Sequence, residues 1–333
     1  MKIVNKITNN RVTTVQIEEA NTMILSINLN PCLDKSVSVE NFTLGKLNRV
    51  SPIRNDAAGK GINVALTVKE LGGDAFVTGF NYSENGRLIT NTLDSAGILH
   101  DLVMVLGPLR TNLKLFDTAT GLHTEINEPG GFVSNDAIED LRFRIRRRAE
   151  KCSVVAMSGS VPPGVPSDIY RTIITDLSDL DVKMVFDAER SLLREGIKAR
   201  PWMIKPNLNE MESLFERNYQ DEKEIIADAK KIVEKGVMNV CVSMGALGAV
   251  LVSREGVWKA PAIEDIEPKG LQGGGDAMVA GICVAAEQGL TLPELLQYGT
   301  AAASASIILE GTQMCKKDDF LKLLPLARVD KIE

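Results

Sequence analysis

The chain has 333 residues, 44% of them hydrophobic and 25% charged, which is typical of a globular protein that buries a sizeable core. Its formal net charge of −6 provides no basic surface for a nucleic-acid backbone or an anionic membrane. The sequence contains no signal-peptide core and no apolar run of about 18 residues. We therefore expect a cytoplasmic protein that binds neither nucleic acid nor membrane.

The first 22 residues are polar and precede the first strong strand pattern, so we expect an N-terminal extension (1–22) to a single domain that covers residues 23–333. From Met23 onward, short β-branched runs alternate with helical patterns. This alternation is typical of an α/β fold with a mostly parallel central sheet and helices on both faces. The predicted strands lie at 23–29, 76–80, 153–160, 182–188, 202–207 and 239–244.

The first predicted strand runs into NPCLDKSV, which places Asp34 at the carboxyl end of the sheet, where ligands of open α/β folds bind. Its carboxylate could hold two sugar hydroxyls, or it could form a turn after Pro31. In the next segment, AAGKGINVALTVKELGG, Gly59 and Gly61 permit close approach of a ligand at the start of a helix. Asn63 could bond to sugar hydroxyls, although an ordinary strand-to-helix turn explains the segment equally well. The GxxxxGK[ST] spacing of a Walker phosphate loop is absent.

Two stretches, about 35–56 and 107–127, interrupt the βαβ alternation. Their alternating residues predict short antiparallel strands that could form a small sheet beside the main one. Recognition of a phosphorylated sugar by an acidic protein needs a few local donors, and a bidentate guanidinium suits phosphate. The candidates are Lys46, Arg110 and, in the turn SGSVPPG, Ser160.

The basic run RFRIRRR at 142–148 lies in a helical pattern, and we expect a solvated helix face there instead of an anion site. The five cysteines lie far apart, which leaves no CxxC metal or redox pair. With only two histidines, a histidine-built zinc site or a serine-histidine triad has little support.

The segment KPNLNE follows a predicted strand and places three polar side chains on one turn beyond the sheet. Lys205 could contact a nucleotide phosphate. Asn207 and Glu210 could hold Mg²⁺ directly or through water, since this ion keeps several of its waters when bound. Alternatively, these residues only form the solvated start of a helix.

The segment LQGGGDAMVAGICVAAEQG at 271–289 leads from three glycines into a small-residue apolar helix. Gly273, Gly274 and Gly275 can present backbone N–H groups at the helix N-terminus, where partial positive charge favours a phosphate. Asp276 could accept the proton of an attacking hydroxyl while those amides stabilise the transferring phosphoryl group. The alternative is that Asp276 only caps the helix.

In this order and at this spacing, the motifs resemble those of the ribokinase-like (PfkB) carbohydrate kinases over roughly residues 23–325. The resemblance implies an ATP-dependent phosphotransferase with a three-layer α/β sandwich, whose small antiparallel β-sheet acts as a lid and as a homodimer surface. The motifs that carry it are NPCLD, AGKGINVA, TLGKLNR, LRTNLK, TEINEPG, SGSVPPG, KPNLNE, VSMGALGA and GGGDAMVAG.

The same resemblance implies a role for each candidate residue. The catalytic base would be Asp276, with an anion hole formed by Gly273, Gly274 and Gly275. The sugar would be held by Asp34, Gly59, Lys60 and Asn63, and its existing phosphate by Lys46, Arg110 and Ser160. The ATP site would be lined by Lys205, Asn207, Ser243 and Gly245, with Mg²⁺ held by Asn207 and Glu210.

Several positions depart from the family pattern. Where the family usually reads GAGDS, this chain has Gly274 and Ala277, and the extra glycine adds backbone freedom at a cost of about 0.5 to 1 kcal/mol. Ala58 replaces a glycine and would be strained if it had to adopt positive φ. Leu66 replaces a frequent arginine, and Gly131 replaces a proline. We expect a modified site that is still active.

Within the family, the pattern is most similar to the branch that phosphorylates sugar phosphates. The expected reaction transfers a phosphoryl group from MgATP to O6 of fructose 1-phosphate. Tagatose 6-phosphate and fructose 6-phosphate are alternative acceptors that sequence spacing does not distinguish. A non-enzyme alternative is a sugar-phosphate sensor without turnover, which the retention of Asp276, Lys205 and Glu210 disfavours. A dinucleotide-dependent oxidoreductase is excluded because no GxGxxG follows the first strand.

Overall fold

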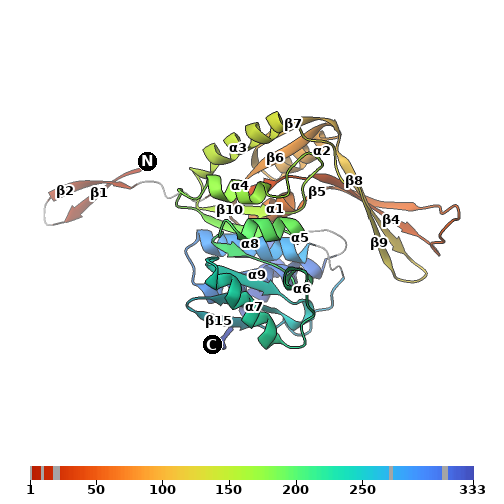
Figure 1. Cartoon of the computed structure of the whole chain (residues 1–333). Coiled ribbons are helices and arrows are strands. Elements are labelled where there is room, and N and C mark those ends of the chain that lie inside the picture. The colour runs from red at the N-terminus through yellow and green to blue at the C-terminus, as the bar shows by residue number, and fades with distance from the viewer. Residues whose placement is uncertain (1, 9–10, 18–22, 270–272, 310–313) are drawn as a thin grey trace.

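A ten-stranded sheet forms the centre of the part of the chain that the computed structural model describes, namely residues 2–8, 11–17, 23–269, 273–309 and 314–333. Helices cover both of its faces, and a four-stranded sheet projects from one side (Figure 1). In spatial order the large sheet consists of β16 (Asp330–Lys331), β15 (Gly256–Ala260), β14 (Ala249–Ser253), β13 (Asn239–Ser243), β12 (Met203–Ile204), β11 (Lys183–Asp187), β10 (Val154–Ser158), β3 (Met23–Asn28), β6 (Asp74–Glu84) and β7 (Leu99–Pro108).

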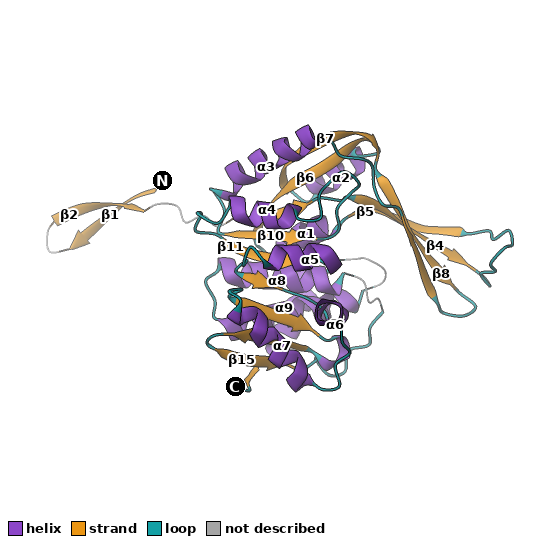
Figure 2. Ribbon diagram, in the orientation of Figure 1, coloured by secondary structure: helices purple, strands orange, loops and turns teal. Residues whose placement is uncertain are grey.

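The strands from β13 to β7 are parallel, and parallel neighbours need connections that cross a face of the sheet. These strands are therefore covered on both sides, and every residue of β10 is buried. One face carries α1 (Lys60–Glu70), α8 (Gly274–Glu287), α9 (Leu292–Ile307) and α10 (Lys317–Leu323), and the other carries α3 (Asn135–Ala149), α4 (Ile169–Asp176), α5 (Arg190–Ile197), α6 (Leu208–Phe215) and α7 (Glu222–Glu234) (Figure 2). The remaining elements are α2 (Arg87–Ser95), which packs on β6 and β7, and the 3-10 turns η1 (Gly245–Leu247) and η2 (Leu324–Leu326). The predicted α/β sandwich with a mostly parallel sheet is confirmed.

The smaller sheet has the strand order β5 (Ser51–Ala58), β4 (Cys32–Val39), β8 (Arg110–Asp117) and β9 (His123–Asn127). Its two outer pairs are antiparallel, as expected, whereas the central pair β4–β8 is parallel. The reason is that β4 continues from β3 and β8 continues from β7, and β3 and β7 leave the main sheet in the same direction.

The first 22 residues contain a hairpin of β1 (Lys2–Thr8) and β2 (Arg11–Ile17), which pair antiparallel as a sheet of their own. Figure 1 shows this hairpin reaching away from the body of the molecule, on the side opposite the small sheet. Residues 2–8 and 11–17 are thus β-strands, and the separation of the N-terminal stretch from the main domain stays a prediction.

Helices α8 and α9 pack unusually close together. Twelve of the fourteen residues of α8 are buried, and most of them are small. A Cβ atom added to Gly281 would lie 2.5 Å from the carbonyl oxygen of Tyr298 on α9, so only glycine fits at this crossing. This contact fixes the position of α8 relative to the rest of the core.

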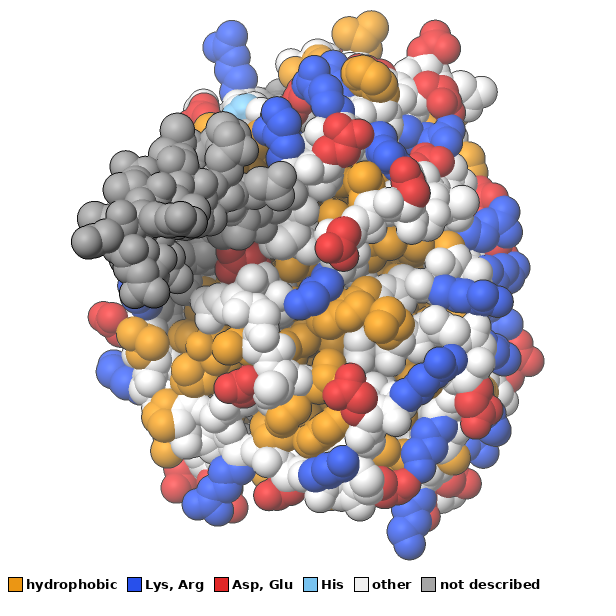
Figure 3. All heavy atoms as spheres, turned by 90° about the vertical axis from the view of Figure 1, so that its left-hand side faces the viewer, with side chains coloured by type: hydrophobic (Ala, Val, Ile, Leu, Met, Phe, Trp, Pro, Cys, Tyr) orange, Lys and Arg blue, Asp and Glu red, His pale blue; other side chains and the backbone are white. Residues whose placement is uncertain are grey.

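The surface carries both signs of charge. Figure 3 shows acidic and basic side chains interspersed on one face. On α3, Arg142 pairs with Asp176 at 2.8 Å and Arg144 with Asp140 at 2.8 Å, as expected for a solvated face. Within the described residues, no helix has the length and apolarity needed to cross a bilayer.

Candidate active site

A cavity of about 820 Å³ opens at the carboxyl ends of the parallel strands, with the small sheet as part of its wall. Most of the residues expected in the site line it, although they come from segments far apart in the sequence. They are Asp34, Gly59, Lys60, Asn63, Arg110, Lys205, Asn207, Glu210, Ser243, Gly245, Gly273, Gly274, Gly275 and Asp276. Lys46 and Ser160 are not among the described residues that line it.

Asp276 lies in the first turn of α8 and is 7% exposed. Its Oδ2 accepts a hydrogen bond from Asn63 Nδ2 at 2.8 Å. The helix is capped by Gly273, whose φ of 82° is left-handed, and no side chain bonds to the cap. The interpretation of Asp276 as a mere helix cap is therefore wrong, and its carboxylate faces the cavity beside the glycine amides.

Burial raises the pKa of Asp276 to about 6, because the charged form is poorly solvated. The positive charge of Lys60 and the hydrogen bond from Asn63 lower the pKa and offset part of this effect. A carboxylate with such a pKa is largely ionised at neutral pH and is still basic enough to accept a proton from a hydroxyl.

Asp34 is held by three neighbours at the other end of the cavity. Lys114 Nζ lies 2.5 Å from its Oδ2, and Asn112 Nδ2 donates to Oδ1 at 3.1 Å. The thiol of Cys32 also donates to Oδ1, at 3.3 Å. Asn112 and Lys114 were missed in the sequence analysis. The signal was their alternation with Arg110 on β8, which puts all three side chains on one face of the sheet.

Arg110 and Ser160 meet at Asn30, the residue that follows Leu29 beyond β3. Arg110 Nη2 donates to the carbonyl oxygen of Asn30 at 3.0 Å, and Asn30 Nδ2 donates to Ser160 Oγ at 3.1 Å. Ser160 is therefore connected through Asn30 to Arg110, which lines the cavity. Three motifs distant in the sequence converge at this point.

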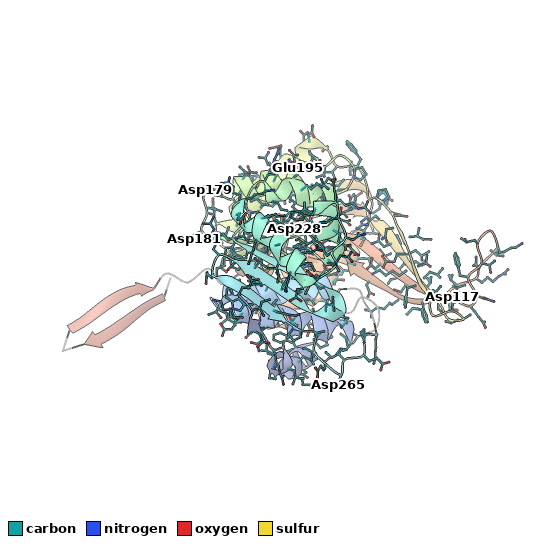
Figure 4. The ribbon with its side chains drawn as sticks, turned by 60° about the horizontal axis from the view of Figure 1, so that its bottom comes forward. Asp117, Asp179, Asp181, Glu195, Asp228 and Asp265 are labelled. Atoms are coloured by element: carbon teal, nitrogen blue, oxygen red, sulfur yellow. The ribbon has the colours of Figure 1, made fainter. Side chains whose placement is uncertain are left out.

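Lys46 is exposed on the loop 40–50, between β4 and β5. Asp117 fixes this loop at the far end of the small sheet, since its carboxylate accepts hydrogen bonds from the backbone N–H groups of Asn41 at 2.9 Å and Phe42 at 3.1 Å (Figure 4). The expectation that Lys46 belongs to the site is not met within one chain, because the small sheet carries its loop away from the cavity.

Asn207 and Glu210 form a capping box at the start of α6. The backbone N–H of Asn207 donates to Glu210 Oε2 at 2.7 Å, and the backbone N–H of Glu210 donates to Asn207 Oδ1 at 2.9 Å. Both residues also line the cavity, so the capping and ligand-binding interpretations are compatible. Lys205 is only 2% exposed and pairs at 3.3 Å with Asp187, a residue that the sequence analysis missed.

The departures from the family pattern have local compensations. In the turn before α1 the positive φ belongs to Gly59, at 137°, which removes the expected strain from Ala58. A Cβ atom at Gly274 would approach Ile307 Cγ2 to 3.0 Å, so the extra glycine makes room for that side chain. A Cβ atom at Gly131 would lie 2.7 Å from the ring of Tyr82.

A buried carboxylate at a glycine-opened helix, with lysines beside it, is the arrangement expected of a phosphotransferase that acts on a hydroxyl group. The chain matches the pfkB family carbohydrate kinase model over residues 27–319. It therefore belongs to the pfkB family of carbohydrate kinases, and ATP is the phosphoryl donor that this membership implies.

Curated relatives and solved structures agree with this family. The chain is 34% identical to the 1-phosphofructokinase of Borreliella burgdorferi over 310 residues, which cover 93% of this chain and 99% of the relative. It is 31% identical to that of Haemophilus influenzae, covering 85% and 90%. The structure of Escherichia coli phosphofructokinase-2 in complex with substrates and products superposes with a TM-score of 0.85 at 25% identity, covering 92% and 100%. The ribokinase of Thermotoga maritima shares the fold, with a TM-score of 0.76 at 20% identity, covering 91% and 99%.

Proposed function

We propose that the protein phosphorylates O6 of fructose 1-phosphate with MgATP and releases fructose 1,6-bisphosphate and ADP. The observation that carries the proposal is the buried carboxylate of Asp276 at the glycine-lined start of α8, facing the same cavity as Asp34 and Asn63. The acceptor is taken from the relatives, several of which are named 1-phosphofructokinase.

In the proposed reaction, Asp276 accepts the proton of the attacking hydroxyl as its oxygen bonds to the γ-phosphorus. The bond between the γ-phosphorus and the bridging oxygen breaks, and ADP carries away the electron pair. The amides of Gly273, Gly274 and Gly275 stabilise the phosphoryl oxygens. The nucleotide is held by Lys205, Asn207, Ser243 and Gly245, and the acceptor by Asp34, Gly59, Lys60, Asn63 and Arg110. Ser160 supports Arg110 through Asn30.

Mg²⁺ would bind beside Asn207 and Glu210. Burial, and then the negative charge of Asp187, raise the pKa of Glu210, so a cation here would relieve unfavourable negative charge. The described residues include no cluster of three or more His, Cys, Asp or Glu side chains suited to a metal. The phosphates of ATP and water would therefore complete the coordination, as Mg²⁺ prefers.

A homodimer through the small sheet is part of the proposal. On the sheet face turned away from Asp34, Val37, Val39 and Leu115 form an apolar cluster. The adjacent loop exposes Leu44 and Leu47 to 84% and 77%. Covering Leu44 and Leu47 with a second copy would bury apolar surface. The same contact would bring the exposed loop that carries Lys46 close to the partner copy.

The test is an ADP-release assay with a panel of phosphosugars at equal concentration. We expect the highest kcat/KM with fructose 1-phosphate, ahead of tagatose 6-phosphate and fructose 6-phosphate. A higher value with either 6-phosphate would replace the acceptor and keep the kinase mechanism. Sugar-phosphate binding without ADP release from any of them would contradict the proposed reaction.

A further inference from the structure

Asp187 ends β11 with its carboxylate between two lysines. Lys60 Nζ lies 3.3 Å from Oδ2, and Lys205 Nζ lies 3.3 Å from Oδ1. The side chain of Asp187 is 2% exposed, so water does little to screen these charges. The two lysines outweigh the effect of burial and leave the pKa of Asp187 below its usual value, so the carboxylate stays ionised.

The two lysines reach Asp187 from different sides of the cavity. Lys60 is the first residue of α1, and its stem lies along Gly159, where an added Cβ would be 3.3 Å from Lys60 Cβ. Lys205 follows β12, and its Nζ lies 3.7 Å from the position of a Cβ at Gly275. The ammonium group of Lys205 thus lies beside Gly275. Lys60 is the cation that lowers the pKa of Asp276 most.

Two further anions compete for these lysines. Asp276 on α8 and Glu210 on α6 line the same cavity, and both interact electrostatically with Lys60 and Lys205. The only hydrogen bond recorded to the Asp276 carboxylate within the described residues comes from Asn63. Asp276 can act as a base only while neither lysine forms a tight ion pair with it, because an ion pair would occupy its oxygens and lower its pKa.

We propose that Asp187 is a positioning residue for phosphoryl transfer: it holds Lys60 and Lys205 along the path of the transferred phosphate and away from the carboxylate of Asp276. The inference rests on the proposed function, since it assigns Asp276 as the base. It assigns a role to a further residue of the cavity wall, one that would act through the two lysines.

The first test is D187N, which keeps the side-chain shape and removes the charge. We expect kcat to fall by a factor on the order of 100, because small displacements of catalytic groups have effects of that size. We also expect the acid limb of the pH dependence of kcat/KM to move to lower pH. The negative charge of Asp187 raises the pKa of Asp276, and its loss also frees a lysine to pair with the base. In K60M/D187N, the loss of kcat should be smaller than the product of the two single losses.

The matched control is D228N. Asp228 on α7 is likewise buried, at 1% exposed, and also holds two cations, Arg217 and Lys231, each at 2.8 Å (Figure 4). It does not line the cavity within the described part of the chain. We expect D228N to lower Tm while kcat and the acid limb stay as in the wild type, which separates the loss of a buried charge from the loss of lysine positioning.

Two outcomes would overturn the inference. One is a folded D187N variant with kcat within about threefold of the wild type or with an unmoved acid limb. The other applies if D187N does not fold. The double variant D187N/K205M is then measured, because it removes one buried anion together with one buried cation. In that variant Lys60 remains without its partner, and an unmoved acid limb would again exclude positioning by Asp187. If neither the wild type nor D228N releases ADP with any sugar phosphate, the proposed function itself is refuted.

Discussion

The two walls of the cavity are built differently. The wall on the main sheet consists of strand and helix ends anchored in the largest core cluster, and its charged residues Lys205 and Asp276 are 2% and 7% exposed. The wall on the small sheet has only a small apolar cluster of its own, and all of β9 is exposed. The proposed function thus places the chemistry on the rigid body, and acceptor recognition on an element that can be changed separately. We expect substitutions on the first wall to change kcat and those on the second to change the KM of the acceptor.

The largest effect is expected for D276N on the rigid wall. Removing the proton acceptor should lower kcat by a factor on the order of 100 or more. ATP affinity, measured by calorimetry, should stay within about threefold, since the glycine amides and Lys205 are unchanged. Turnover close to that of the wild type would remove Asp276 from its assigned role.

The next largest effect is expected for D34N, on the small sheet. The change would weaken the proposed hydrogen bonds to the sugar, and it leaves Lys114 without its carboxylate partner at 2.5 Å. A hydrogen bond to a charged group contributes about 1.5 to 3 kcal/mol, so the KM of the acceptor should rise about tenfold or more, with the KM of ATP unchanged. The control is D56N. Asp56 on β5 is the residue paired with Asp34 in the sheet, and it is not among the described residues that line the cavity. Equal effects of the two variants would contradict a specific role for Asp34.

A smaller effect is expected for N63A, which changes a residue of the rigid wall. Asp276 must be ionised to act, so kcat/KM should rise with pH through about 6, the pKa of that carboxyl. The hydrogen bond from Asn63 lowers this pKa, so its removal should move the acid limb to higher pH by about one unit. If the acid limb does not move, it reports the titration of the substrate phosphate, whose second pKa is also about 6, and not that of Asp276.

The smallest effect is expected for K46A at the far end of the small sheet. If a partner copy receives this lysine, the KM of the acceptor should rise about two- to fivefold at concentrations where the dimer forms, as expected for an exposed charge worth about 1 kcal/mol or less. K35A, also an exposed lysine of this sheet, is the control. An unchanged KM in a protein shown by light scattering to be dimeric would exclude Lys46 from the acceptor site.

The parallel strands and the residues at their carboxyl ends could be predicted from the sequence, because the βαβ order places those ends at one edge of the sheet. Lys205, which follows β12, was found in this way, and Asp276 was found from the glycines before it. Asp34 lines the cavity as expected, but it lies within β4 of the small sheet and not at the end of a parallel strand. Asp187 was missed, since a single acidic residue at the end of a buried strand has no local signature. Its meaning depends on two lysines that lie 127 and 18 residues away in the sequence.

The small sheet was harder to predict for a related reason. Alternation of residues reveals strands but not the direction of their partners, so the parallel pairing of β4 with β8 could not be predicted. Nor does alternation tell how far a loop lies from a cavity, which is why Lys46 was expected in the site. The hydrogen bonds of Asp117 that fix this loop join residues 75 and 76 positions apart.

The crossing of α8 and α9 extends the region that activity depends on beyond the cavity. Because Gly281 leaves no space for a methyl group against Tyr298, any larger residue must push the whole helix along or away from its neighbour. Asp276 lies in the first turn of that helix, so its carboxylate would shift relative to the other residues of the cavity, although each of them is intact. Inactivating mutations should therefore be found along this interhelical seam, more than a helical turn from the reacting atoms.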